Sequence, residues 1–224
     1  MRFASGSPPT PVLTGIPRGR SGNRGALATD PSGALLVVTG DAGNPHAASD
    51  PKSLAGKVLR IDDQGKPAPG DPNASSPVVA SGLIDPGGVC ASTDGKTTWI
   101  TDRTPTADVL YRLKLGQPLG SPAWRWPDRP GVSGCWVTAS TVAVGTAVAG
   151  NVQTLTLNAD GSFSTKPDIS FAGKDGFGRI SAMNAISDSA AFVGTSNKDG
   201  GKPVSSDDRV AVILNSGGGS GGKD

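Results

Sequence analysis

Residues 25–61 read GALATDPSGALLVVTGDAGNPHAASDPKSLAGKVLRI, and this stretch contains one structural repeat in its clearest form. An apolar start at 26–28 leads to a turn at 30–33, and a β-rich apolar run follows at 35–38. A polar loop then connects Thr39-Gly40-Asp41 to a further strand at 57–61. Turn residues between two short apolar runs are typical of a β-hairpin. The stretch therefore predicts a hairpin to which the loop adds a third strand.

The same spacing recurs along the chain, with a Gly or Ser standing six residues before a Thr. The four copies are Gly33 with Thr39, Gly95 with Thr101, Ser140 with Thr146 and Ser189 with Thr195, which lie 62, 45 and 49 residues apart. A unit of about 40–50 residues with several short strands indicates a β-propeller, because one four-stranded blade cannot cover its own two faces. We therefore predict an all-β propeller with about four recognisable blades. The alternative is chance similarity among Gly- and Ser-rich hairpins.

The composition narrows the class of protein. A chain of 224 residues fits one domain, and its 33 Gly and 19 Pro residues make turns dense. The net charge of +2, without a long run of Lys or Arg, argues against a nucleic-acid partner. No apolar run reaches the ~18–20 residues that span a membrane, and no apolar core of a signal peptide follows Met1.

Three stretches resemble the soluble quinoprotein glucose/sorbosone dehydrogenase family: TGIPRG at 14–19, GALATDPSGALLVVTGDAGNP at 25–45 and DPKSLAGKVLRI at 50–61. The resemblance covers about residues 12–214 and is nearest to the actinobacterial lipoprotein branch of the family. It implies a six-bladed propeller that oxidises sugars and holds pyrroloquinoline quinone (PQQ) and calcium at one end of the central channel. We therefore expect four blades of this six-bladed pattern in an N-terminally truncated member.

The resemblance also suggests the domain limits. Residues 1–13 would be outer strands of a preceding, incomplete blade, and 14–214 would form the propeller domain. Residues 215–224 are rich in Gly and Ser and are expected to be a flexible tail.

The resemblance places the catalytic histidine of the family at Gly22, which has no side chain to act as a base. General-base chemistry at neutral pH suits an imidazole group. Asp41 matches the acid that orients this histidine and is the candidate catalytic residue, although we prefer a turn-forming role at the end of a strand. His46, the only histidine, lies in the polar loop 42–57 and is expected to be solvated.

Three residues are candidates for cofactor binding by resemblance: Asn23, Asp85 and Arg179. In the run GLIDPGG at 82–88, Ile84, Asp85 and Gly87 replace the Arg, Asn and Gln of the family. PQQ is a tricarboxylate and needs cations, so these replacements are electrostatically unfavourable.

The family implies calcium as well, through backbone carbonyl groups of a run that matches 101–105, where Thr-Pro replaces Gly-Pro. The replacements at this run and at 82–88 argue against both cofactors, and we expect no metal ligand. Asp62, Asp63 and Asp71 lack the spacing of an EF-hand loop and are expected to be solvated turn residues.

Two cysteines and three tryptophans each allow two interpretations. Cys90 and Cys135 are either a disulfide between neighbouring blades, which would indicate an oxidising compartment, or two buried thiols. The exported nature of the resembled family favours the disulfide. Trp124, Trp126 and Trp136 could stack on a sugar, but packing between blades is the preferred interpretation.

The sequence supports two main functions. The replacements favour a non-catalytic, exported propeller that binds a carbohydrate, an envelope component or another protein. The alternative is a PQQ-dependent aldose sugar dehydrogenase. An incomplete gene product with no function of its own is a third interpretation. Export to the periplasm, the cell envelope or the medium is expected from the resemblance.

Overall fold

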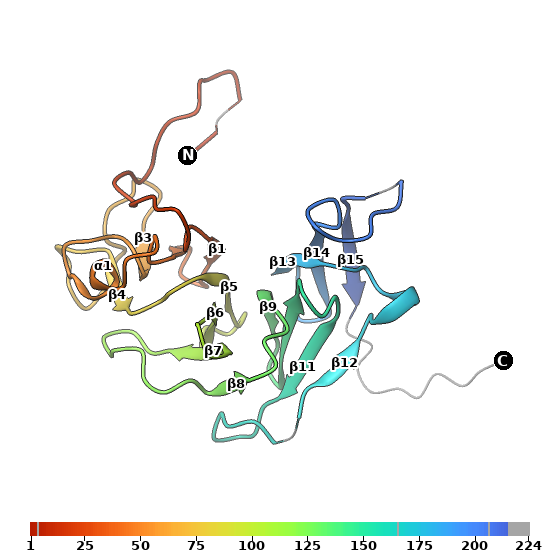
Figure 1. Cartoon of the computed structure of the whole chain (residues 1–224). Coiled ribbons are helices and arrows are strands. Elements are labelled where there is room, and N and C mark those ends of the chain that lie inside the picture. The colour runs from red at the N-terminus through yellow and green to blue at the C-terminus, as the bar shows by residue number, and fades with distance from the viewer. Residues whose placement is uncertain (4, 165, 206, 215–224) are drawn as a thin grey trace.

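The computed structural model describes residues 1–3, 5–164, 166–205 and 207–214, and it shows four β-sheets arranged in an arc (Figure 1). Within each sheet the strands follow one another in chain order, and each is antiparallel to the next. This is the arrangement of propeller blades, so the predicted all-β propeller is confirmed. We number the sheets blade 1 to blade 4 along the chain. The tail predicted at 215–224 lies outside the described residues.

The strand bounds are as follows. Blade 1 contains β1 (Gly25–Thr29), β2 (Leu35–Thr39), β3 (Lys57–Ile61) and β4 (Val78–Ser81). Blade 2 contains β5 (Pro86–Ala91), β6 (Thr98–Arg103), β7 (Asp108–Leu113) and β8 (Trp124–Trp126). Blade 3 contains β9 (Val132–Val137), β10 (Thr141–Thr146), β11 (Val152–Thr156) and β12 (Asp168–Ser170). Blade 4 contains β13 (Ile180–Ala185), β14 (Ala190–Thr195) and β15 (Val210–Leu214).

Short helices lie in two connections, α1 (Pro45–Ser49) and a 3₁₀ turn at Gly173–Asp175. Within the described ranges, no helix is long and apolar enough to cross a membrane. Residues 1–13, where outer strands were predicted, carry an isolated β-bridge between Arg2 and Thr10.

The first strand of each blade lies on the inside of the arc, where β1 packs on β5, β5 on β9 and β9 on β13 (Figure 1). Close approach of these strands requires glycine. A Cβ atom on Gly134 of β9 would collide with the backbone nitrogen of Met183 on β13. The four inner strands thus line a central channel, and their starting ends meet at one mouth.

Apolar side chains fill the three interfaces between successive blades. Representative members are Leu36, Val38 and Ile100 between blades 1 and 2, Trp99, Leu110 and Leu155 between blades 2 and 3, and Trp136, Met183 and Val193 between blades 3 and 4. Trp126 and Trp136 are buried, and Trp124 packs against the cluster between blades 2 and 3. The predicted packing role of these tryptophans is therefore confirmed.

The threonine of the sequence repeat joins the second strand of a blade to the start of its third. In three blades the threonine hydroxyl accepts a hydrogen bond from the backbone N–H at the third strand or just before it. The pairs are Thr39 with Lys57, Thr146 with Asn151 and Thr195 with Arg209, at 3.0, 3.1 and 3.0 Å. In blade 2, Thr101 instead donates to the carbonyl oxygen of Ser133 in the next blade. The repeated spacing is thus a repeated hydrogen-bonding element.

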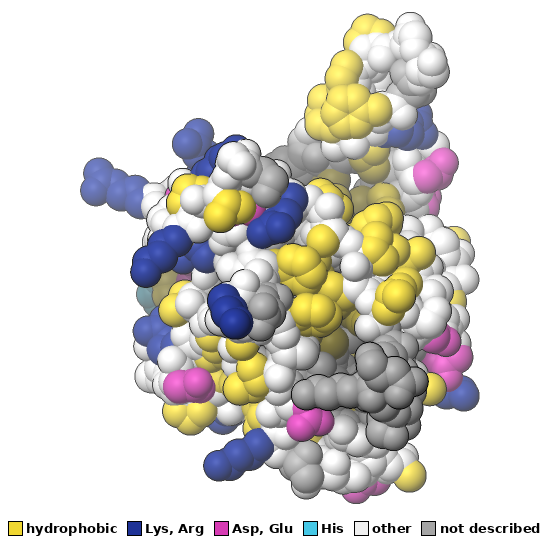
Figure 2. Space-filling view, turned by 90° about the vertical axis from the view of Figure 1, so that its right-hand side faces the viewer, with side chains coloured by type: hydrophobic (Ala, Val, Ile, Leu, Met, Phe, Trp, Pro, Cys, Tyr) yellow, Lys and Arg dark blue, Asp and Glu magenta, His cyan; other side chains and the backbone are white. Residues whose placement is uncertain are grey.

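One outer face of blade 4 is apolar. Along β14 and β15, Ala191, Val193 and Ile213 are buried on the side of blade 3. The alternate residues project from the other face, where Phe192 is 48%, Val212 51% and Leu214 71% exposed. Figure 2 shows hydrophobic side chains gathered on this side of the molecule.

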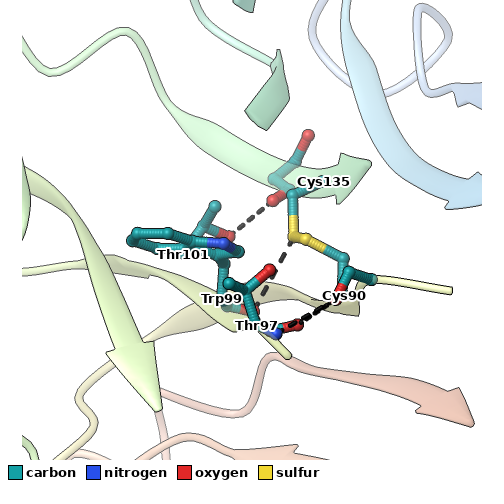
Figure 3. Close-up of a disulfide and its surroundings, with 7 residues drawn as sticks. Cys90, Thr97, Trp99, Thr101 and Cys135 are labelled. Atoms are coloured by element: carbon teal, nitrogen blue, oxygen red, sulfur yellow. Dashed lines mark hydrogen bonds between the residues drawn. A yellow bond between two sulfur atoms is a disulfide. The ribbon is translucent and has the colours of Figure 1, made fainter. Parts of the chain in front are cut away.

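Cys90 on β5 and Cys135 on β9 form a disulfide, with an S–S distance of 2.06 Å and a Cα–Cα distance of 5.7 Å (Figure 3). The bond joins the inner strands of blades 2 and 3, and both residues are buried. The predicted disulfide between neighbouring blades is therefore confirmed. It closes a loop that contains the rest of blade 2.

A buried ion-pair network replaces the solvated carboxylate predicted at Asp71. Arg60 of β3 donates to Asp30 and to Asp71, each at 2.7 Å, and to the carbonyl oxygen of Pro69 at 2.9 Å. The side chain of Asp71 is 1% exposed, so the prediction for this residue was wrong. Its sequence surroundings are those of a turn, and the partner that buries it comes from a strand eleven residues earlier.

Candidate functional site

The residues immediately before the four inner strands meet at the mouth of the channel. They are Arg24, Asp85, Gly131 and Arg179. Arg24 Nη2 donates to the carbonyl oxygen of Val132 on β9 at 3.4 Å. Ser133 Oγ donates to the carbonyl oxygen of Ile180 on β13 at 2.7 Å. These contacts bring equivalent positions of blades 1, 3 and 4 together, and two of them carry guanidinium groups.

A third arginine reaches the same place from blade 2. Arg103 ends β6, and it donates from Nε to the carbonyl oxygen of Val132 at 2.9 Å and from Nη2 to that of Gly131 at 2.7 Å. Burial, together with the nearby positive charges of Arg24 and Arg179, lowers the pKa of Arg103 to about 10. Arg103 therefore stays charged at neutral pH, and guanidinium groups of three blades share the mouth.

Gly87 provides the space that Arg24 occupies. A Cβ atom at this position would lie 2.5 Å from Arg24 Nη2 and 2.9 Å from the carbonyl oxygen of Val132. A side chain at residue 87 is therefore incompatible with the observed position of Arg24. Gly87, which replaces the Gln of the family, therefore makes room for Arg24 at the mouth.

Two acidic residues next to the mouth direct their carboxylates at backbone N–H groups. Asp108 accepts from the N–H groups of Gly131 and Val132 at 2.6 and 2.9 Å. Asp102 accepts from those of residues 84 and 85 at 3.0 and 2.7 Å. Burial raises the pKa of Asp102 to about 6, although both hydrogen bonds act in the opposite direction. These carboxylates fix the shape of the mouth.

Asp85 is the acidic residue that pairs with an arginine of the mouth in the described structure. Its Oδ2 lies 3.6 Å from Arg24 Nη1, and both side chains are partly exposed, at 26% and 30%. The predicted cofactor-binding position Asp85 therefore lies at the mouth but carries a charge that opposes an anionic ligand.

Arg179, the second predicted residue at the mouth, is fixed through its backbone. Its N–H donates to Asn197 Oδ1 at 2.7 Å, while its side-chain Nε is buried and has no hydrogen-bond partner within the described ranges. The side-chain contacts of Arg24 are long, at 3.4–3.6 Å. Both side chains therefore keep N–H donors for a further acceptor.

A cavity of about 680 Å³ opens beside the mouth. Close to the mouth it is lined by polar or small residues, among them Asn23, Arg24 and Ser181. Apolar side chains line other parts, among them Leu27 and Met183. The site thus offers cationic and polar groups at one end and an apolar wall at the other.

Asp41 and Asn23 border the mouth, but their polar groups are bonded within their own loops. Asp41 is buried, and its Oδ1 accepts from the N–H of Gly43 at 2.7 Å. The Asn23 amide exchanges two hydrogen bonds with the backbone of Gly19, each at 2.9 Å. Gly22 has a left-handed φ of 62°, and a Cβ atom there would collide with Asp41 Oδ1. Asp41 thus fills the space that a side chain at residue 22 would need.

His46 belongs to α1, which interrupts the loop predicted at 42–57. Asn44 caps this helix and Pro45 begins it, and His46 is exposed. The buried ammonium group of Lys57 donates to the carbonyl oxygens of Ala47, Ala48 and Ala55, at 3.0, 2.7 and 2.8 Å. Lys57 thus fixes the helix against the sheet.

Arg24 and Arg103 were missed by the sequence interpretation. A signal for Arg24 is present in the sequence, because it stands directly before the first strand of its repeat, as Arg179 does in the last repeat. No comparable signal marks Arg103, because its partners Gly131 and Val132 are 28 and 29 residues away.

The fold and the site define a propeller with an arginine-rich channel mouth, and the sequence identifies the family. The profile described as Glucose / Sorbosone dehydrogenase matches residues 12–132, which is more than half of the chain. The chain therefore belongs to the glucose/sorbosone dehydrogenase family. No curated protein matches the sequence.

Solved structures of related propellers agree with this assignment. The PQQ-bound aldose sugar dehydrogenase from Streptomyces coelicolor is 26% identical, with a TM-score of 0.78 over 89% of this chain and 64% of its own. An oxidoreductase (glucose dehydrogenase) from Thermus thermophilus is 27% identical, with a TM-score of 0.79 over 91% and 68%. The apo form of the soluble aldose sugar dehydrogenase from Escherichia coli, at 19% identity and a TM-score of 0.61, shares the fold. The chain spans 64% of the length of the Streptomyces enzyme.

The two cofactors of the family require different groups at the mouth. PQQ is a tricarboxylate, and the guanidinium groups of Arg24 and Arg179 can pair with such an anion. Calcium requires several oxygen ligands. Within the described ranges no group of three acidic, His or Cys side chains could hold a metal, and the carbonyl oxygens of Gly131 and Val132 already accept from Arg103. The mouth therefore offers cationic partners for an organic anion.

Proposed function

We propose that this chain is a non-catalytic, ligand-binding member of the glucose/sorbosone dehydrogenase family. The observation that carries the proposal is that residue 22, where the family resemblance places the catalytic base, is a glycine with a left-handed φ of 62°. The base implied by the family resemblance would have to project from residue 22. The exposed His46 on α1 is no substitute, because it is not among the residues that line the cavity at the mouth.

The proposed setting is an exported protein whose channel mouth or rim binds a carbohydrate or an envelope component. The disulfide between Cys90 and Cys135 supports an oxidising compartment, because such bonds are rare in the reducing cytosol.

A PQQ-dependent aldose sugar dehydrogenase is the second candidate. It is favoured by the cationic mouth and by the 26% identity to a PQQ-bound aldose sugar dehydrogenase. In this case another group would have to accept the proton of the sugar hydroxyl during oxidation.

A dye-linked oxidation assay separates the two functions. The purified chain is supplied with PQQ, calcium and a panel of aldoses, with the Streptomyces enzyme as the positive control. We expect no aldose-dependent dye reduction by this chain. Turnover that is lost in Asp41→Ala would overturn the proposal and establish the second candidate.

A further inference from the structure

The last strand of blade 4 is an open sheet edge. Blades 1 to 3 each contain four strands, whereas the described part of blade 4 contains three, with β15 on the outside (Figure 1). β15 pairs with β14 on one side and with no described strand on the other. The sequence that follows, residues 215–224, contains no apolar side chain and cannot supply an apolar fourth strand.

This edge lacks the features that protect the outer strands of the other blades. Exposed edges in natural proteins are usually short or carry a charge, which prevents pairing with another chain. β8 and β12 are three residues long and contain the exposed charged residues Arg125 and Asp168. In the four-residue strand β4, the exposed residue is Ser81. β15 has five residues, VAVIL, without a charge, and is therefore the unprotected edge of the described blades.

The backbone groups available for pairing belong to alternate residues of β15. Just before this strand, the N–H of Thr195 donates to the carbonyl oxygen of Arg209 at 3.0 Å. Because hydrogen-bonded residues alternate along an antiparallel strand, the second and fourth residues of β15 bond to β14. The N–H and C=O groups of its first, third and fifth residues therefore point outward, and these residues are Val210, Val212 and Leu214.

The exposed side chains of the edge are symmetric about its central residue, Val212. Val210 and Leu214 lie two residues before and after it, and all three side chains are apolar and exposed. A second copy of β15, antiparallel and centred on the same residue, would place Val212 opposite Val212 of the partner subunit. Val210 would then face Leu214 of the partner subunit. Every facing pair would combine outward backbone groups with apolar side chains that favour a sheet.

We propose that β15 is the interface of a homodimer, in which it pairs antiparallel with β15 of a second copy about a two-fold axis at Val212. The two three-stranded sheets join into one sheet of six strands. Phe192 lies opposite Val212 on β14, so these residues of both copies form one apolar row across the joined sheet. A second copy fits better than a foreign strand, because donors, acceptors and side chains are all symmetric about Val212. The interface is independent of the ligand-binding role proposed above.

Sedimentation velocity of the full chain over a dilution series tests the proposal, and we expect a reversible equilibrium between monomer and dimer. Val212→Lys places two like charges opposite each other and should weaken the dimer by at least about tenfold. Ile169→Lys makes the same change at an exposed apolar residue of β12 and should leave the equilibrium unchanged. A natural chain that is monomeric at every concentration would overturn the proposal and leave the edge to a strand of a different protein. Equal effects of the two variants would overturn it as well.

A charge exchange separates loss of the interface from loss of the fold. Val212→Lys and Val212→Asp should each be monomeric alone. A mixture of the two variants should form dimers, because opposite charges then face each other across the two-fold axis. A mixture that stays monomeric would contradict the position of this axis.

Cysteine cross-linking tests the register of the two strands. The two natural cysteines are already joined to each other, so an added cysteine supplies the free thiol. The Cα atoms of a facing, hydrogen-bonded pair lie about 5.5 Å apart, which suits a disulfide. Val212→Cys should therefore give a covalent dimer when oxidised glutathione is added. Val210→Cys should not, because its two copies would lie about 13 Å apart along the strands. Equal cross-linking of both variants would overturn the register.

Discussion

The carboxyl group of Asp102 should make the molecule less stable as the pH rises, which is the opposite of the usual effect of a carboxyl group. Burial raises its pKa to about 6, above the value of 3.8 expected in the unfolded chain. The folded state therefore binds a proton more tightly than the unfolded state between about pH 4 and 6. As the pH rises through this range, the free energy of unfolding should fall by about 3 kcal/mol from this group.

Urea denaturation of the natural chain and of Asp102→Asn between pH 4 and 7 measures this effect. The free energy of unfolding of the natural chain minus that of Asp102→Asn should fall from pH 4 to 6 and then level off. Asp128→Asn, at an exposed residue, controls for the loss of a surface carboxylate. A difference that stays constant across the range would show that Asp102 is not desolvated as described.

At the scale of single elements, the threonine at the end of β10 should stabilise blade 3. Thr146 is fully buried, and its hydroxyl accepts from the N–H of Asn151 and donates to its carbonyl oxygen, at 3.1 and 2.8 Å. Thr146→Val keeps the shape but leaves the N–H of Asn151 without an acceptor, while the Asn151 carbonyl oxygen still accepts from the backbone N–H of residue 146 at 2.9 Å. We expect a loss of about 1–3 kcal/mol in the free energy of unfolding.

Denaturant titration of Thr146→Val measures this loss. Thr156→Val, at an exposed position of β11, is the matched control and should have a much smaller effect. Equal losses in both variants would indicate that β-propensity, not the hydrogen bond, determines the role of the threonine.

The elements that sequence could predict are those encoded by neighbouring residues. The hairpins, with a turn at 30–33 and its counterparts, need only local spacing, and so does the threonine repeat that ends β2, β10 and β14. The mouth was predicted only in part. Arg24 contacts Val132 across 108 residues, and no local pattern encodes which residues of separate blades meet. Asp71 was misjudged for the same reason, because its partner Arg60 lies on a strand.

At the scale of the whole molecule, the disulfide should be a principal source of stability. It joins blades 2 and 3 and closes a loop with a sequence separation of 45 residues. The chain-entropy treatment of such a loop gives a stabilisation of about 4 kcal/mol. The double variant Cys90→Ala/Cys135→Ala should lose a comparable amount in denaturant titration. If the variant is as stable as the natural chain, the inner strands are held by packing alone.

The same bond changes how the chain would respond to a mechanical load. Tension applied at the two termini passes from β5 to β9 through the sulfur atoms, so β6, β7 and β8 bear none of it. The residues between the cysteines stay out of the extended contour, which shortens it by about 150 Å relative to the reduced chain. The three outer strands of blade 2 are therefore shielded from the load, while its inner strand β5 and the blades on either side are not.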